Sequence, residues 1–178
     1  DLEIISNPEL LPIDFWKDVK VLSLTHISNT TGLIVPIEKW ISFAQTNKAI
    51  TIVDGSQAVS SKHINISKIN SDFYYLSAHK VYGPMGLGVL FISDRFKLSS
   101  PYKLGGGIVD YVTTTDYTLT NGIERFEAGT PNVANTYAFG ESLDFFKNIS
   151  SLLNSQHDLA TYLFNELKTI ETSHYKVH

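Results

Sequence analysis

The first half of the chain contains short apolar runs separated by polar and helical segments. Runs at 20–25, 49–54, 72–77 and 88–92 predict strands, and the run at 49–54 is β-branched without alternation, as in strands buried on both faces. Between the first two runs, apolar residues recur at i, i+3, i+4 and i+7 after a proline, which predicts a helix over 36–46. This alternation of strands and a helix favours an α/β fold with parallel strands.

The second half has helical periodicity. We predict one long helix over 133–148 and another over 155–170, whose apolar stripe contains Leu159, Leu163, Leu167 and Ile170. The serine- and asparagine-rich stretch between the two helices predicts a domain junction. We therefore expect one domain over residues 1–150 and the start of a second over residues 151–178.

Composition and charge narrow the class of protein. The 178 residues are 43% apolar and 18% charged, which favours a folded globular chain. The net charge of −4 gives no basic surface for nucleic acid, and no apolar run is long enough to span a membrane. The chain has no cysteine, which excludes disulfides, thiolate metal sites and a cysteine nucleophile within these residues.

The ends of the sequence carry further expectations. The first residues lack a basic segment followed by an apolar one, so no secretory signal is predicted and a cytoplasmic location is expected. The chain does not begin with methionine, and its last residues, 175–178, look like a strand cut short. We therefore expect the sequence to be a fragment of a longer protein.

Polar and ionisable residues follow three of the predicted strands, in segments 25–32, 53–58 and 76–84. Ligands of open α/β sheets bind beyond the carboxyl ends of the strands. Taken alone, each piece has an ordinary explanation, because Asp-Gly after a strand is usually a turn and a loop lysine is usually on the surface. Their coincidence at three strand ends predicts a binding site.

The residue types at these ends suit pyridoxal phosphate. Lys80 can form a Schiff base, Asp54 can pair with a pyridinium nitrogen, and small hydroxyls and an imidazole can bind a phosphate. The glycines of 83–88 precede a strand instead of opening a helix, so they do not form a dinucleotide fingerprint. A phosphate-loop element is also missing, which argues against a nucleotide-binding module, and no residues have metal-ligand spacing.

Five motifs in order resemble a known family. They are Thr-His-Ile-Ser-Asn at 25–29, Val-Asp-Gly-Ser-Gln-Ala-Val at 53–59, the stretch 72–88 with Ser-Ala-His-Lys, three glycines at 105–107, and Arg-Phe-Glu-Ala-Gly-Thr-Pro-Asn at 125–132. This set closely resembles the class V aminotransferases, and within them the sulfur-mobilisation type of cysteine desulfurase and its selenocysteine lyase relatives. The resemblance runs from about Val19 to the last residue and covers less than half of a typical family chain.

The resemblance implies roles for the residues of the middle motifs. Lys80 would hold pyridoxal 5'-phosphate as a Schiff base and then move the α-proton of the substrate. Asp54 would pair with the pyridine nitrogen, and Gln57 would hydrogen-bond the phenolic oxygen of the ring. Ser77 and His79 would bind the phosphate.

The flanking motifs carry further implied roles. Asn29 would lie near the ring oxygen and the substrate carboxylate. Thr130 would reach the phosphate of a neighbouring subunit, because the family forms homodimers with composite sites. We expect His26 to be a half-buried histidine with its hydrogen bonds satisfied, and Arg125 and Glu127 to form an ion pair.

The fold implied by the resemblance is the large domain of fold-type I pyridoxal phosphate transferases, a mostly parallel sheet flanked by helices with an antiparallel strand at 88–92. The segment after residue 150 would begin the small C-terminal domain. In the family, a histidine that stacks on the cofactor, an arginine for the substrate carboxylate and a sulfur-accepting cysteine lie outside the stretch that corresponds to this chain.

The implied activity is that of a cysteine desulfurase, which converts cysteine to alanine and passes persulfide sulfur towards iron–sulfur cluster assembly. Its partners would be a small amino acid, cysteine first, a second copy of the chain and a sulfur-acceptor protein. A selenocysteine lyase, another C–S lyase or another class V aminotransferase would share the same residues. A non-catalytic truncated product that acts with a partner chain remains a further alternative.

Overall fold

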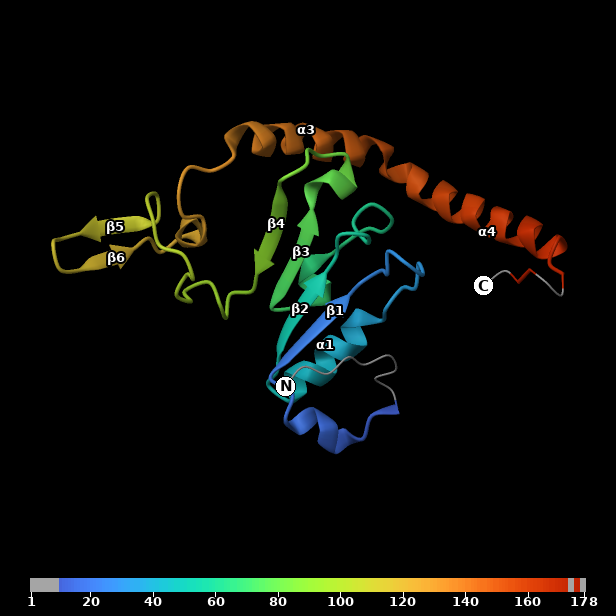
Figure 1. The fold of residues 1–178 in the computed structure, drawn as a ribbon, viewed down its shortest axis with the longest axis horizontal. Coiled ribbons are helices and arrows are strands. Elements are labelled where there is room, and N and C mark those ends of the chain that lie inside the picture. Colours follow the sequence, from blue (N-terminus) through green and yellow to red (C-terminus); the bar gives the residue numbers. More distant parts are fainter. Residues whose placement is uncertain (1–9, 173–174, 177–178) are drawn as a thin grey trace.

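The computed structural model describes residues 10–172 and 175–176, and its centre is a four-stranded sheet in the order β1-β2-β3-β4 (Figure 1). Strands β1 (Val21–Thr25), β2 (Ile50–Asp54) and β3 (Phe73–Ser77) run parallel, and β4 (Gly88–Ile92) is antiparallel to β3. All four strands were predicted from the sequence, and the predicted antiparallel direction of β4 is confirmed.

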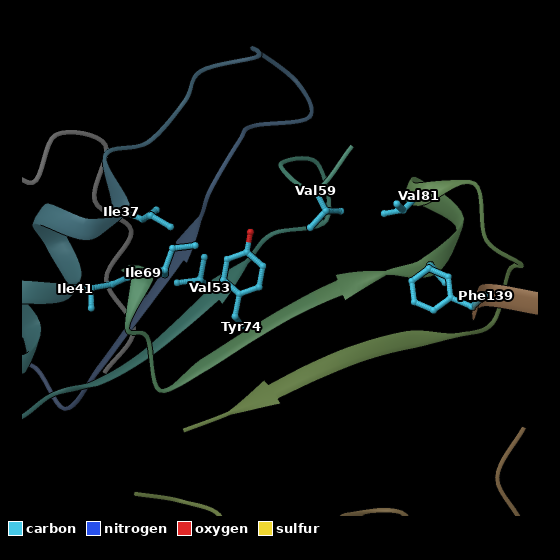
Figure 2. Close-up of a cluster of buried hydrophobic side chains, with 9 residues drawn as sticks. Ile37, Ile41, Val53, Val59, Ile69, Tyr74, Val81 and Phe139 are labelled. Atoms are coloured by element: carbon cyan, nitrogen blue, oxygen red, sulfur yellow. The ribbon is translucent and has the colours of Figure 1, made fainter. Parts of the chain in front are cut away.

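Helix α1 (Ile37–Thr46) connects β1 to β2 and covers one face of the sheet (Figure 1). The stripe that predicted this helix, Ile37, Trp40, Ile41 and Ala44, is buried in full. The Trp40 ring stacks on Trp16 of the short 3-10 helix η2 (Ile13–Lys17), with 5.9 Å between ring centroids. The larger core cluster lies against the sheet and includes Val53, Ile69 of the short helix α2 (Ile66–Ile69), and Tyr74 (Figure 2).

The turn after β3 is held by helix α3. This turn is the 3-10 helix η3 (Ala78–Val81), and Phe139 of α3 (Val133–Ile149) packs in the same cluster as Ala78 and Val81. A Cβ at Gly83 would lie 2.6 Å from the Phe139 ring, so only glycine permits this close approach. The Asn135 side chain also donates to the Met85 carbonyl at 3.1 Å, which fixes the start of α3 against the same loop.

A hairpin that the sequence did not predict follows β4. Strands β5 (Val109–Val112) and β6 (Tyr117–Leu119) pair in antiparallel fashion and project from the sheet, and the 3-10 helix η4 (Ile123–Phe126) follows them (Figure 1). The expected ion pair between Arg125 and Glu127 does not form within the described chain. The Arg125 Nε atom is buried there without a hydrogen-bond partner.

Helix α3 continues through η5 (Ser150–Leu152) into α4 (Leu153–Thr169), which runs away from the sheet (Figure 1). Both helices were predicted, and the apolar stripe of α4 is exposed to solvent. The domain junction near residue 150 stays a prediction. Tyr175 and Lys176 are not in a strand, and Val177 and His178 lie outside the described residues. Within the part of the chain that the structure describes, no helix is long and apolar enough to cross a membrane.

Candidate active site

The carboxyl ends of β2 and β3 bring most of the predicted site residues to one edge of the sheet. Asp54 is the last residue of β2, and Gln57 lies in the turn that follows it. Ser77 is the last residue of β3, and His79 and Lys80 lie in η3 directly after it. Because β2 and β3 are neighbouring parallel strands, the two groups of side chains come from adjacent strand ends.

The Asp54 carboxylate is oriented by two donors. Its Oδ1 atom accepts a hydrogen bond from the Ser56 N–H at 2.9 Å. Tyr75, which pairs with Asp54 across β2 and β3, donates its hydroxyl to the same carboxylate. Burial, followed by the charge of Asp54 and this hydrogen bond, raises the pKa of Tyr75, so the hydroxyl keeps the proton that it donates. Sequence reasoning missed Tyr75, because its contact depends on strand register.

The turn that carries Lys80 is held from both sides. Ala78 N–H donates to the Leu87 carbonyl at 3.0 Å, and Gly83 N–H donates to the Ala78 carbonyl at 3.0 Å. Lys80 is half-buried and His79 is exposed. Across the described residues, the side chains of Ser77, His79 and Lys80 make no hydrogen bond or ion pair with protein groups. A rigid turn thus presents a hydroxyl, an imidazole and an amine.

Hydrogen bonds also fix the turn after β2. The Gly55 carbonyl accepts from the N–H groups of Ala58 and Val59 at 2.9 and 3.1 Å. The Gln57 carbonyl accepts from the hydroxyl of Ser60 at 3.3 Å, while the Gln57 side chain is half-buried. The backbone of this turn is therefore fixed without use of the Gln57 amide.

His26 follows β1 and is only 2% exposed, more deeply buried than expected. Its Nδ1 atom lies 3.1 Å from the Tyr74 hydroxyl, so the prediction of a satisfied histidine is confirmed. Burial lowers the pKa of His26, and the positive charge of Lys62 lowers it further, while Glu38 acts in the opposite direction. The ring is therefore neutral near pH 7.

Asn29 and Thr130 lie further from the paired strand ends along the chain. Asn29 is exposed in the loop after β1, which is closed by a hydrogen bond from the Val35 N–H to the His26 carbonyl at 2.9 Å. Thr130 is exposed just before α3, and its neighbour Gly129 donates to the Gly106 carbonyl at 2.8 Å. In the described chain, no hydrogen bond joins Thr130 to the residues after β2 and β3.

Comparison with protein families gives a match that spans almost the whole chain. The model of the family described as aminotransferase class-V matches residues 8–177. This chain belongs to the class-V aminotransferase family. The membership accounts for the order of its five motifs and for the mostly parallel sheet with one antiparallel strand.

Among curated members of the class-V aminotransferase family, a cysteine desulfurase of Escherichia coli O139:H28 is 31% identical over 166 residues, which is 91% of this chain and 41% of that protein. The structure of a cysteine desulfurase from Thermococcus onnurineus NA1 superposes with a TM-score of 0.82 at 30% identity, covering 88% of this chain and 40% of that one.

A second solved relative is a cysteine desulfurase of Escherichia coli, with a TM-score of 0.71 and 32% identity over 79% of this chain and 34% of that one. The chain therefore spans about two fifths of the length of the curated relatives that it matches. The fold-type I assignment is confirmed, since this chain, with its mostly parallel sheet, superposes on both solved cysteine desulfurases.

Proposed function

We propose that this chain is the cofactor-binding core of a pyridoxal phosphate-dependent cysteine desulfurase, which takes sulfur from cysteine and leaves alanine. One observation carries the proposal. The carboxylate of Asp54 and the amine of Lys80 stand at adjacent strand ends in a class-V aminotransferase chain, and its curated cysteine desulfurase relatives are 31% identical.

The donor set at this edge fits pyridoxal phosphate. The cofactor needs an amine for attachment, an acid for its ring nitrogen, and hydrogen-bond donors for its ring oxygen and phosphate. Lys80, Asp54 and Gln57 supply the first three groups, and Ser77 and His79 supply phosphate donors from the same turn as Lys80. Ser56 and Tyr75 already hold the Asp54 carboxylate in place, which suits a group that would orient the cofactor ring.

The bound cofactor supplies an electron sink for the pair of electrons left at the substrate α-carbon. Asp54 would hold the proton on the pyridine nitrogen, which keeps the ring electron-poor. Gln57 would donate its amide to the ring oxygen, and Ser77 and His79 would fix the phosphate end. The Nζ of Lys80 would anchor the cofactor covalently and, once free, take the proton from the substrate α-carbon.

The remaining predicted residues complete this proposal. Asn29 would lie near the substrate carboxylate. Thr130 would reach the phosphate bound by a second copy of the chain, and its exposure supports a role outside its own subunit. The sulfur-accepting cysteine is not among these 178 residues, so it would belong to another part of the protein. We place the protein in the cytoplasm, as a homodimer that passes sulfur to an acceptor protein for iron–sulfur assembly.

The experiment that tests the cofactor site is borohydride reduction of the full-length protein after incubation with pyridoxal phosphate, followed by peptide mass mapping. We expect the cofactor on the peptide that contains Lys80. Lys80→Ala should abolish the label, and Lys68→Ala, a change at an exposed lysine elsewhere, should leave it intact. A label on another lysine, or none, would overturn the assignment of Lys80.

The activity is tested separately. Full-length protein is incubated with cysteine and a thiol reductant, and alanine and sulfide are measured. We expect both products in equal amounts. Selenocysteine and an amino-group acceptor serve as competing substrates, because a lyase or a transaminase would prefer one of them. A protein that carries the cofactor on Lys80 but releases neither alanine nor sulfide from cysteine would refute the desulfurase assignment and leave the cofactor site standing.

A further inference from the structure

A hydrogen bond joins two buried side chains that lie on either side of β2, the strand that ends at Asp54. His26 follows β1, Tyr74 lies in β3, and β2 runs between them. Tyr74 pairs in register with Val53, and both side chains lie in the larger core cluster (Figure 2). The Tyr74 hydroxyl therefore passes beneath the end of β2 to reach the His26 ring at 3.1 Å.

Gly55 makes this passage possible. A Cβ atom at residue 55 would overlap the Tyr74 ring and its hydroxyl. The ring thus occupies the space where any other residue would place its side chain. The Tyr74 side chain is 1% exposed, so the surrounding core leaves it little room to move away.

The peptide between Asp54 and Gly55 is bound on both sides by the backbone beside this pair. The His26 N–H donates to the Asp54 carbonyl at 2.9 Å. The Gly55 N–H donates to the carbonyl of Tyr75, the residue after Tyr74, at 2.8 Å. The side-chain bridge and the two backbone bonds close a ring of contacts around the end of β2.

The protonation states of Tyr74 and His26 are those that their hydrogen bond needs. Burial, followed by the charges of Asp54 and Glu38, raises the pKa of Tyr74, so its hydroxyl is protonated and donates. Burial lowers the pKa of His26, so its ring is neutral and has a nitrogen that accepts. We assign the acceptor as Nδ1 and the ring proton to Nε2. A neutral pair adds no uncompensated charge to the core.

We propose that His26 and Tyr74 are a positioning pair, which holds the Asp54–Gly55 peptide and thereby sets the Asp54 carboxylate against the bound cofactor. Neither residue touches the cofactor in this role. The inference rests on the proposed function, because it gives the pair its purpose. Its structural half, the hold on the peptide, stands on the contacts of this chain alone.

The first test needs no cofactor. Amide hydrogen exchange is measured in the full-length protein for Gly55, Ser56 and the following turn. Tyr74→Phe keeps the ring and removes only the hydroxyl, so we expect about fivefold faster exchange there, the size of one hydrogen bond. Tyr162→Phe, at an exposed position on α4, is the matched control and should leave exchange at this turn unchanged.

The second test measures affinity for pyridoxal phosphate. We expect Tyr74→Phe to weaken binding about fivefold in the wild-type background, and to have no further effect once Asp54→Asn has removed the carboxylate that the pair positions. A residue that only stabilised the fold would weaken both backgrounds alike. His26→Asn, which keeps an acceptor near the position of Nδ1, should restore most of the affinity that His26→Leu loses.

The outcomes separate the two proposals. Exchange and affinity in Tyr74→Phe that match Tyr162→Phe would overturn the positioning pair. An equal loss in the Asp54→Asn background would overturn it as well, because the hydroxyl would then act on the whole fold. If the wild-type protein binds no pyridoxal phosphate, the proposed function fails, and with it the purpose of the pair. Exchange would still decide whether the pair holds the Asp54–Gly55 peptide.

Discussion

Asp72 gives the sharpest prediction about stability, because it is a nearly buried carboxylate that joins the starts of two strands. Its Oδ2 atom accepts from the Thr51 N–H at 2.8 Å and from the Thr51 hydroxyl at 3.0 Å. Its own N–H donates back to the Thr51 hydroxyl oxygen at 2.9 Å. On the other side, Oδ1 lies 3.3 Å from Nε of the half-exposed Arg95. Replacing Asp72 with alanine would remove this carboxylate and its contacts with Thr51 and Arg95.

The loss of stability in Asp72→Ala comes mainly from the polar groups of Thr51 that would be left without an acceptor. Thr51 is fully buried, so its N–H and hydroxyl would lose their acceptor with no water to replace it. Each stranded donor costs about 1–3 kcal/mol. The lost ion pair with Arg95 adds less than about 1 kcal/mol, because that side chain is partly in solvent. We therefore expect Asp72→Ala to lower the free energy of unfolding by about 2–6 kcal/mol, nearly all of it from the two stranded donors of Thr51.

Urea unfolding of the full-length protein, monitored by tryptophan fluorescence, would measure this change. The two tryptophans of these 178 residues both lie in one buried cluster. Asp94→Ala is the matched control: this carboxylate is 93% exposed, and its loss should cost within about 0.5 kcal/mol. Asp72→Asn retains an acceptor for Thr51 and should fall between the two. An Asp72→Ala protein within about 1 kcal/mol of the control would show that Thr51 does not depend on this carboxylate.

Three further predictions concern the site and the sheet. Tyr75→Phe removes a hydroxyl that holds Asp54 and should weaken pyridoxal phosphate binding about three- to tenfold; an unchanged dissociation constant in an absorbance titration would contradict this. Burial lowers the pKa of His26, so this histidine binds a proton more readily in the unfolded chain than in the folded one. The free energy of unfolding should therefore fall as the pH drops below about 6.5. Urea midpoints measured across that range should show a smaller fall in His26→Asn. The 178-residue chain alone should aggregate, because the outer edges of β1 and β4 pair with no other described strand; a clean monomer in size-exclusion chromatography would show that these edges are tolerated.

Strand β2 and helix α1 could be predicted because their burial leaves a pattern in the residues. Strand β2 is a β-branched run and α1 has one apolar stripe, so the residues of each element are enough to predict it. The hairpin of β5 and β6 was missed for the opposite reason. Every residue of β5 is exposed, so no buried face imposes alternation between apolar and polar positions. A strand without a buried face leaves no periodic signal.

The candidate site divides in the same way. The positions of Asp54 and Lys80 after neighbouring strands followed from chain order, since parallel strands end at one edge of a sheet. The contacts of Tyr75 with Asp54 and of Tyr74 with His26 did not follow. Both depend on the register between strands, and register is set by packing across the sheet that no local pattern records.

Gly55 shows how one residue can have two physical explanations of which only one applies. Within the sequence, Asp54-Gly55 resembles a turn, where glycine supplies a positive φ. In the structure the φ angle of Gly55 is not positive. A Cβ atom at residue 55 would overlap the Tyr74 ring. The glycine is therefore required by packing and not by backbone conformation. A side chain at residue 55 would push Tyr74 away from His26, so the glycine, the tyrosine and the histidine act on Asp54 as one unit.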